Sequence, residues 1–215
     1  MTLEEAIAKI KPLDHNAMEI AQKRWDSIAK PLHSLGKLET LLIQIAGITG
    51  NAEVDLSRRG LIAMCADNGV VEEGVTQTGQ EVTAIVAENF LKYDTSVGVM
   101  CKQNHAEIFP VDMGMVTDTK VRTDHKIAYG TQNMTKGPAM TREQAVKGLE
   151  AGIDMVRELN DKGYRILATG EMGIGNTTTS SAVASVLLKQ PVEEMTGRGA
   201  GLSDDGLHRK IHAIE

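Results

Sequence analysis

The chain has 215 residues, a formal net charge of -6 and two cysteines. Proteins that bind nucleic acid phosphates are normally basic, so this charge argues against nucleic acid as the main partner. No apolar run is long enough to span a membrane, and the acidic first residues are unlike a secretory signal. We therefore expect a cytoplasmic protein without a membrane partner, in which Cys65 and Cys101 are buried, reduced thiols.

The N-terminal part of the chain predicts helices only. A capping box, Thr2-x-x-Glu5, opens a first helix over residues 2–10. A second helix is expected over residues 14–29, and a third follows with Leu38, Leu41, Leu42 and Ile45 at helical spacing. We expect residues 1–50 to form a small helical subdomain and residues 51–215 to form the larger domain.

In the larger domain, short apolar runs alternate with helical patterns. The runs at 61–66, 108–111 and 164–170 predict strands, and the continuous apolar run at 61–66 is typical of a strand covered on both faces. A long helix is expected from the capping box Thr141-x-x-Gln144 to a stop at Gly163. The residues expected to face inward from this helix are Val146, Leu149, Ile153, Val156 and Leu159. This alternation predicts an α/β fold with a parallel, doubly wound, Rossmann-like sheet.

The most informative segment is Gly170-Glu-Met-Gly-Ile-Gly-Asn-Thr-Thr178, which joins the last predicted strand to a helix. Glycines let the backbone approach a ligand closely, and a helix N-terminus attracts an anion. Glu171 adds a carboxylate, which suits a ligand with hydroxyl groups beside its phosphate. The segment lacks the Lys-Ser/Thr ending of a P-loop and the glycine spacing of a dinucleotide fingerprint. We expect it to bind a phosphorylated small molecule.

Three acidic turns follow the predicted strands: Asp67-Asn-Gly69, Asp112-Met-Gly114 and Glu171-Met-Gly173. In a parallel sheet the carboxyl ends of the strands share one edge, where ligands bind. The three turns therefore predict one ligand-binding rim that includes Asp67 and Asp112. The alternative is that each acid-x-Gly sequence is only favourable turn chemistry.

Taken together, the chain resembles the nicotinate-nucleotide–dimethylbenzimidazole phosphoribosyltransferase family. The segments that carry the resemblance, besides Gly170–Thr178, are Lys30–Glu39, Asp67–Val70, Glu73–Val75, Gln80–Thr83, Val111–Gly114, Gly137–Met140 and Gly197–Ala200. The resemblance implies transfer of 5-phosphoribose from nicotinate mononucleotide to 5,6-dimethylbenzimidazole, a step in the biosynthesis of cobalamin. The products would be nicotinate and α-ribazole 5'-phosphate. It further implies a homodimer that uses no cofactor and no metal.

The resemblance also implies site residues. Those expected at the phosphate and nucleotide are Gly173, Ile174, Gly175, Asn176, Thr177, Gly197, Gly199 and Lys210. Those expected at the aromatic base are Thr78, Val86 and Met172. Glu171 would lie near the ribose. For Lys210 the alternative is an ordinary solvated helix face.

Several positions depart from the family pattern. Asn68 stands where the family usually has histidine, and Val86 stands where some members have glutamine, which leaves the preferred base open. The apolar spacing near Glu215 predicts a helix that is cut rather than finished. The resemblance places the family's general-base glutamate beyond residue 215. Because that base is missing from this chain, we expect slow turnover. The alternatives are an enzyme for a purine or phenolic base, and a nucleotide-binding module without catalysis.

Overall fold

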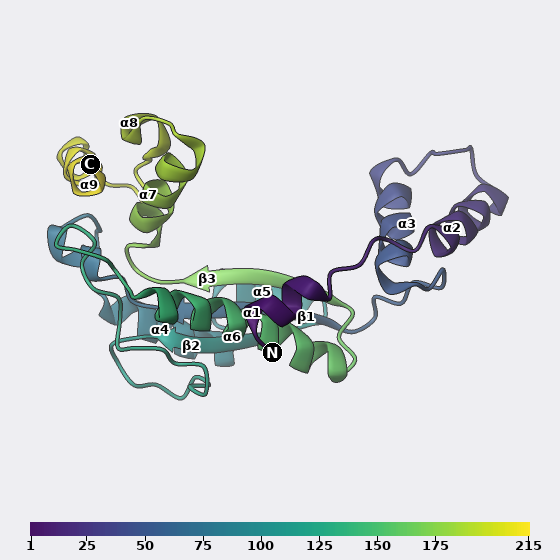
Figure 1. Cartoon of the computed structure of the whole chain (residues 1–215), viewed down its shortest axis with the longest axis horizontal. Coiled ribbons are helices and arrows are strands. Elements are labelled where there is room, and N and C mark those ends of the chain that lie inside the picture. Colours follow the sequence, from purple (N-terminus) through teal and green to yellow (C-terminus); the bar gives the residue numbers. More distant parts are fainter. The chain divides into compact units, whose positions relative to one another are not determined.

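The computed structural model describes residues 1–215. They form two compact units, Met1–Arg58 and Arg59–Glu215. The first unit contains helices only, and the second contains a sheet with its helices (Figure 1).

The first unit is built on the contact between two helices. Its elements are α1 (Leu3–Ala8), α2 (His15–Ser27) and α3 (Lys37–Thr49). The buried apolar residues of α2 and α3 are small, namely Ala17, Ala21 and Ala46. A Cβ added at Gly47 would lie only 2.7 Å from Met18 Cγ, so the two helices approach closely there. Leu38 and Leu41, two residues of the predicted apolar stripe, are more than half exposed, because α2 covers only one face of α3.

A buried ion pair closes the segment between α2 and α3. Lys30 Nζ lies 2.9 Å from Glu39 Oε1, and the Leu35 N–H donates to the same oxygen at 3.0 Å. The hydrogen bond from Lys30 lowers the pKa of Glu39. Glu39 is only 3% exposed, so this pair fixes the two ends of a segment that carried part of the family resemblance.

The second unit has a three-stranded parallel sheet in the order β2-β1-β3. The strands are β1 (Arg59–Ala66), β2 (Ala106–Gly114) and β3 (Ile166–Met172). The predicted parallel sheet is therefore confirmed. The chain moves from β1 to β2 on one side and then crosses to β3 on the other side. This reversal makes the carboxyl ends of β1 and β3 a topological switch point, where open α/β sheets bind ligands.

Helices cover both faces of the sheet, as a doubly wound fold requires. The remaining elements are η1 (Gly69–Glu73), α4 (Glu81–Leu91), α5 (Ser96–Gln103), α6 (Arg142–Asp161), α7 (Asn176–Leu188), α8 (Val192–Met195) and α9 (Asp204–Ile214). Ala63 and Cys65 of β1 pack in one core with Phe90 of α4. Ile62 precedes Ala63 in β1, so its side chain points to the opposite face of the sheet. There it packs in a second core with Met155 of α6.

The inward face of α6 differs in part from the prediction. Ala151, Met155 and Leu159 are buried, whereas Leu149 and Val156 are 56% and 47% exposed. The prediction was wrong for these last two residues. The buried residues repeat every four positions and form a narrow stripe, because the sheet covers only one side of the helix. The apolar residues beside that stripe remain outside.

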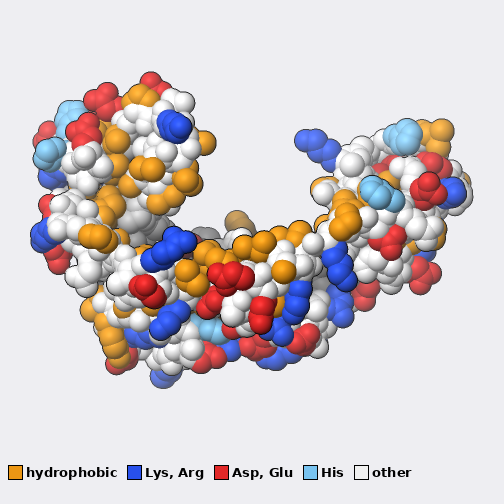
Figure 2. All heavy atoms as spheres, in the orientation of Figure 1, with side chains coloured by type: hydrophobic (Ala, Val, Ile, Leu, Met, Phe, Trp, Pro, Cys, Tyr) orange, Lys and Arg blue, Asp and Glu red, His pale blue; other side chains and the backbone are white.

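The outer face of α7 is apolar. Val183, Val186, Leu187 and Leu188 are all more than half exposed. Figure 2 shows hydrophobic side chains over this part of the second unit. None of the helices is both long enough and apolar enough to cross a membrane.

A buried charge pair holds the turn after β2. Lys126 Nζ lies 3.1 Å from Asp112 Oδ2 and 3.1 Å from Asp118 Oδ1. The ammonium group also lies 3.8 Å from the centre of the Tyr129 ring. Burial by itself would lower the pKa of Lys126, but the hydrogen bonds to Asp118 and Asp112 outweigh it and the pKa is raised. Asp112 is fully buried, so Lys126 supplies the charge that compensates it.

We predict that Lys126→Met destabilises the protein by about 3–5 kcal/mol, because it leaves the Asp112 carboxylate buried and uncompensated. Chemical unfolding monitored by circular dichroism measures the change. The matched control is Lys136→Met, which breaks an exposed 2.7 Å ion pair with Glu72 and should change the stability little or not at all. Similar losses in the two variants would contradict the role given to Lys126.

Candidate functional site

A cavity of about 260 Å³ opens beside the carboxyl end of β3. Its wall is formed by the end of β3, the first turn of α7 and the glycine loop between them, which consists of residues 173–175. Two further loops, at residues 75–78 and 198–202, complete the wall. The lining residues are Val75, Thr76, Gln77, Thr78, Met172, Gly173, Ile174, Gly175, Asn176, Thr177, Arg198, Gly199, Ala200 and Leu202. Most of the residues predicted for the phosphate and the base are therefore brought together at this cavity.

The glycine loop lies against the neighbouring backbone, and this explains its glycines. A Cβ added at Gly173 would lie 2.2 Å from the carbonyl oxygen of Ala66. Gly175 has a left-handed backbone, with φ of +91°, and a Cβ there would lie 3.0 Å from Val71 Cγ2. Only glycine adopts such a backbone without strain while leaving this space free.

The first turn of α7 presents backbone donors at the cavity. The N–H groups of Gly175 and Thr177 donate to no protein acceptor. Asn176 N–H donates to Gly173 O at 3.0 Å, which closes the turn. Free N–H groups and the dipole of this 13-residue helix together favour an anion, such as a phosphate, in the cavity.

Glu171 lies at the end of β3, next to the glycine loop. Burial raises the pKa of its carboxyl group, although a hydrogen bond from Asn176 Nδ2 acts in the opposite direction. The carboxyl group thus holds its proton more strongly than an ordinary glutamate does. Burial, and to a smaller extent the negative charge of Glu171, raises the pKa of the Cys65 thiol to about 12.

Lys210 is buried beneath the cavity wall. It is 1% exposed, and its ammonium group donates to Thr177 Oγ1 at 2.8 Å and to Gly197 O at 3.0 Å. Burial lowers its pKa. The alternative of a solvated helix face is therefore wrong for Lys210. The residue ties α9 to the first turn of α7 and puts a positive charge behind the predicted anion site.

Two lining residues with polar groups were missed by the sequence reasoning. Arg198 donates to Leu202 O at 2.9 Å and pairs with Asp204, which places a cation at the edge of the cavity. Gln77 Nε2 donates to Gly201 O at 2.6 Å and joins the two loops that face the glycine loop. Arg198 lies within the Gly197–Ala200 segment that carried the resemblance, so that segment was the signal that could have found it.

The two rim aspartates stabilise turns. Asp112 Oδ1 accepts from Gly114 N–H at 2.9 Å and from Met115 N–H at 2.7 Å. Asp67 Oδ2 accepts from Val116 N–H at 2.8 Å. Both side chains are fully buried, and neither lines the cavity. This geometry favours the turn interpretation for both residues.

Two other predicted site residues lie away from the cavity wall. Val86 and Met172 both pack against the core that contains Cys65 and Phe90. Of these two residues, only Met172 lines the cavity. Gly197 contributes its carbonyl oxygen to Lys210. Contact of Val86 or Gly197 with a ligand stays a prediction.

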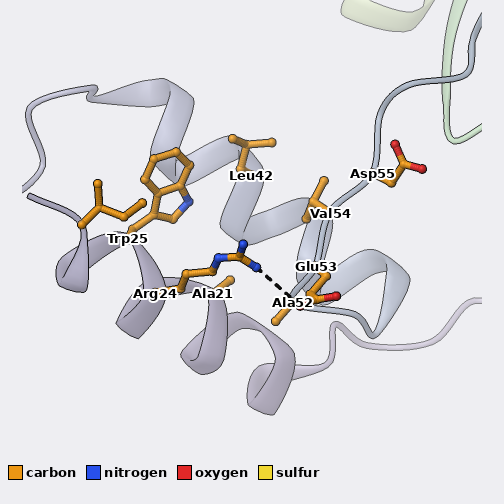
Figure 3. Close-up of a pocket in the computed structure, with 9 residues that line it drawn as sticks. Ala21, Arg24, Trp25, Leu42, Ala52, Glu53, Val54 and Asp55 are labelled. Carbon is orange, nitrogen blue, oxygen red and sulfur yellow. Dashed lines mark ion pairs between the residues drawn. The ribbon is translucent and has the colours of Figure 1, made fainter.

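Two further cavities contain none of the predicted site residues. One, of about 530 Å³, lies within the first unit between α2, α3 and the segment that follows α3. Figure 3 shows Trp25 and Leu42 on its walls and the 3.8 Å ion pair between Arg24 and Glu53 at its edge. The other, of about 230 Å³, is mostly apolar and lies beside the end of β2. No group of three or more His, Cys, Asp or Glu side chains is arranged to hold a metal ion.

A phosphoribosyltransferase family model matches residues 10–215, and the chain belongs to this family. The chain is 50% identical over 217 residues to the nicotinate-nucleotide–dimethylbenzimidazole phosphoribosyltransferase of Ruminiclostridium cellulolyticum. It is 46% identical over 215 residues to the enzyme of the same name from Clostridium tetani. These matches cover 100% and 99% of the chain, but only 62% and 59% of the two relatives.

The fold is similar to that of a solved relative. The crystal structure of CobT from Thermus thermophilus matches with a TM-score of 0.84 and 36% sequence identity. The match covers 93% of this chain and 61% of that one. The chain thus spans about three-fifths of the length of the relatives it matches.

We predict that Glu171→Gln stabilises the protein relative to the wild type as the pH rises. The folded-state pKa of Glu171 is raised above 4.5, so its ionisation opposes folding. The wild type therefore loses stability from about pH 4.5 upward until the folded-state pKa is passed, and the variant does not. The gain should be under about 1 kcal/mol, because the side chain is partly exposed.

Urea unfolding of both proteins between pH 4 and pH 8 checks this prediction. The control is the same series with Glu107→Gln, which removes a carboxylate at an exposed position of β2 and measures the effect of losing a carboxylate from the sheet in general. A difference between Glu171→Gln and the wild type that is constant with pH would contradict the assignment.

We predict that Lys210→Met weakens the binding of inorganic phosphate by about tenfold or more, because the charge behind the first turn of α7 is lost. The change should also cost about 1–3 kcal/mol of stability, since the Thr177 hydroxyl and the Gly197 carbonyl lose a buried donor. Calorimetry and thermal unfolding measure the two effects. Lys189→Met, at the exposed far end of α7, is the control and should change neither.

Proposed function

We propose that this protein transfers 5-phosphoribose from nicotinate mononucleotide to 5,6-dimethylbenzimidazole, giving nicotinate and α-ribazole 5'-phosphate in cobalamin biosynthesis. The single observation that carries the proposal is the glycine loop, whose free Gly175 and Thr177 N–H groups line a cavity in a member of this family. The names of the relatives support the choice of substrates.

The proposed reaction is a displacement at C1′ of the ribose. A ring nitrogen of the benzimidazole forms the new bond to C1′ from the face opposite nicotinate, and the anomeric centre inverts. The bond from C1′ to the pyridinium nitrogen breaks, and its electron pair neutralises the departing ring. The second nitrogen of the benzimidazole loses its proton to a base. No covalent enzyme intermediate is needed, so the protein acts mainly by holding the two rings in line.

The residues at the cavity have distinct parts in this proposal. The glycine loop binds the 5'-phosphate, with Lys210 as charge behind it and Arg198 at the edge. Met172 and Thr78 would contact the aromatic base, and Glu171 would lie near the ribose hydroxyls. No carboxylate lines the cavity, so the residues on its wall supply no evident group to take the proton from the attacking base.

We further propose that the protein acts in the cytoplasm and as a homodimer. Two buried free cysteines suit a reducing compartment, where thiols stay unpaired. The exposed apolar residues of both units are compatible with assembly into a larger particle. Light scattering on the purified chain measures the number of copies in the particle.

We predict that Gly175→Val reduces the binding of nicotinate mononucleotide and the formation of product by at least about tenfold. Valine disfavours the left-handed backbone at this position and would also collide with Val71. Calorimetry measures binding, and chromatography of nicotinate and α-ribazole 5'-phosphate measures turnover. The matched control is Gly152→Val on α6, where an added Cβ meets nothing within 4 Å.

Three outcomes of these measurements distinguish the candidate functions. Product formation that is lost in Gly175→Val but kept in Gly152→Val supports the proposal. Binding of nicotinate mononucleotide without product would identify a nucleotide-binding module without catalysis, which is also compatible with the lack of a lining carboxylate. Neither binding nor product would overturn the proposal. Offering adenine and phenol together with dimethylbenzimidazole tests whether another base is preferred.

A further inference from the structure

The turn after β1 contacts the glycine loop through one side chain. Asn68 Nδ2 donates to Ile174 O at 3.1 Å, although the two residues are 106 positions apart. Asn68 is itself held from the other side, because Gln80 Nε2 donates to its carbonyl oxygen at 3.0 Å. This contact lies at the switch point between β1 and β3.

The hydrogen bond from Asn68 sets the direction of a donor on the cavity wall. A peptide unit is planar and trans, so its C=O and N–H groups point in opposite directions. The carbonyl of Ile174 and the N–H of Gly175 belong to the same unit. Because Asn68 binds that carbonyl, the Gly175 N–H points away from Asn68, and it donates to no protein acceptor.

The preceding peptide unit is fixed separately. Ile174 N–H donates to the fully buried Thr83 Oγ1 at 3.0 Å, and Gly173 O accepts from Asn176 N–H. The unit between Ile174 and Gly175 has no other side chain on its carbonyl oxygen. Glycine tolerates φ of either sign, so this unit could reverse at low cost without Asn68. A reversed unit would present a carbonyl oxygen to the anion in place of an N–H donor.

We propose that Asn68 is a positioning residue that keeps the Gly175 N–H directed at the phosphate of the ligand. The inference rests on the proposed function, since it takes the bound anion to be the 5'-phosphate of nicotinate mononucleotide. Asn68 does not line the cavity, so it acts through the Ile174–Gly175 peptide unit. It therefore affects the binding of the phosphate group and does not affect the binding of the nucleoside part of the ligand.

The test compares ligands with and without the phosphate. Asn68→Leu removes the donor at similar size. It should weaken binding of nicotinate mononucleotide by about tenfold or more and leave the affinity for nicotinate riboside within about twofold. Asn68→His keeps a ring N–H donor and should stay within about threefold of the wild type for both ligands. Calorimetry measures all affinities.

The matched control is Asn104→Leu. The Asn104 side chain also donates to a backbone carbonyl, that of Met100 at 2.8 Å, but it lies at the end of α5 and away from the loop. This variant should bind both ligands like the wild type. A crystal structure of Asn68→Leu adds a readout that needs no ligand, because it should show the Ile174–Gly175 peptide unit reversed or in two orientations.

Equal loss of affinity for the two ligands in Asn68→Leu, or no loss for either, would overturn the inference while the proposed function stands. An Asn68→His variant as weak as Asn68→Leu would also overturn it. If the wild type binds neither ligand, the proposed function fails. The inference about the phosphate then fails with it, whereas an unchanged Ile174–Gly175 peptide unit in the crystal structure of Asn68→Leu would overturn the inference while the proposed function stands.

Discussion

The carboxyl edge of the sheet depends on backbone segments that approach too closely for side chains. A Cβ at Gly69 would lie 2.6 Å from the backbone nitrogen of Asn133, and one at Gly173 would lie 2.2 Å from the carbonyl oxygen of Ala66. These contacts bring the turn after β1 against the loop after β2 on one side and against the glycine loop on the other. A side chain at either glycine would separate the strand ends and open the cavity wall. The position of the backbone donors proposed to bind the anion therefore follows from backbone packing.

A net charge of -6 does not exclude the proposed anion site, because the charges are distributed unevenly along the chain. The cavity wall combines a helix N-terminus with Lys210 behind it and Arg198 at its edge, and no carboxylate lines it. The buried carboxylates nearby are engaged elsewhere: Asp67 and Asp112 accept backbone N–H groups, and Lys126 compensates Asp112. The local distribution of charge around the cavity, rather than the net charge of the chain, therefore supports the proposed anionic ligand.

Much of the fold was predictable, because apolar runs and capping boxes report local structure directly. The three parallel strands, the helix caps at Thr2 and Thr141 and the glycine loop all followed from residue patterns. The burial of Lys210 did not, since its partners Thr177 and Gly197 lie 33 and 13 positions away. The exposure of Leu149 and Val156 was missed because periodicity identifies an apolar helix face but not how much of it is covered. The geometry that favours a turn role for Asp67 and Asp112 likewise depends on contacts between distant segments.

The outer edge of β2 has a consequence for how the sheet can be extended. Residues 108, 110 and 112 are the central outward positions of this strand. Ile108 N–H donates to the Tyr93 hydroxyl, Asp112 N–H donates to Arg122 O, and Pro110 has no N–H. An additional strand would find no free donor at these three positions, which disfavours edge-to-edge pairing along this part of β2. β3 pairs only with β1, so further strands can be added to this sheet in one direction only.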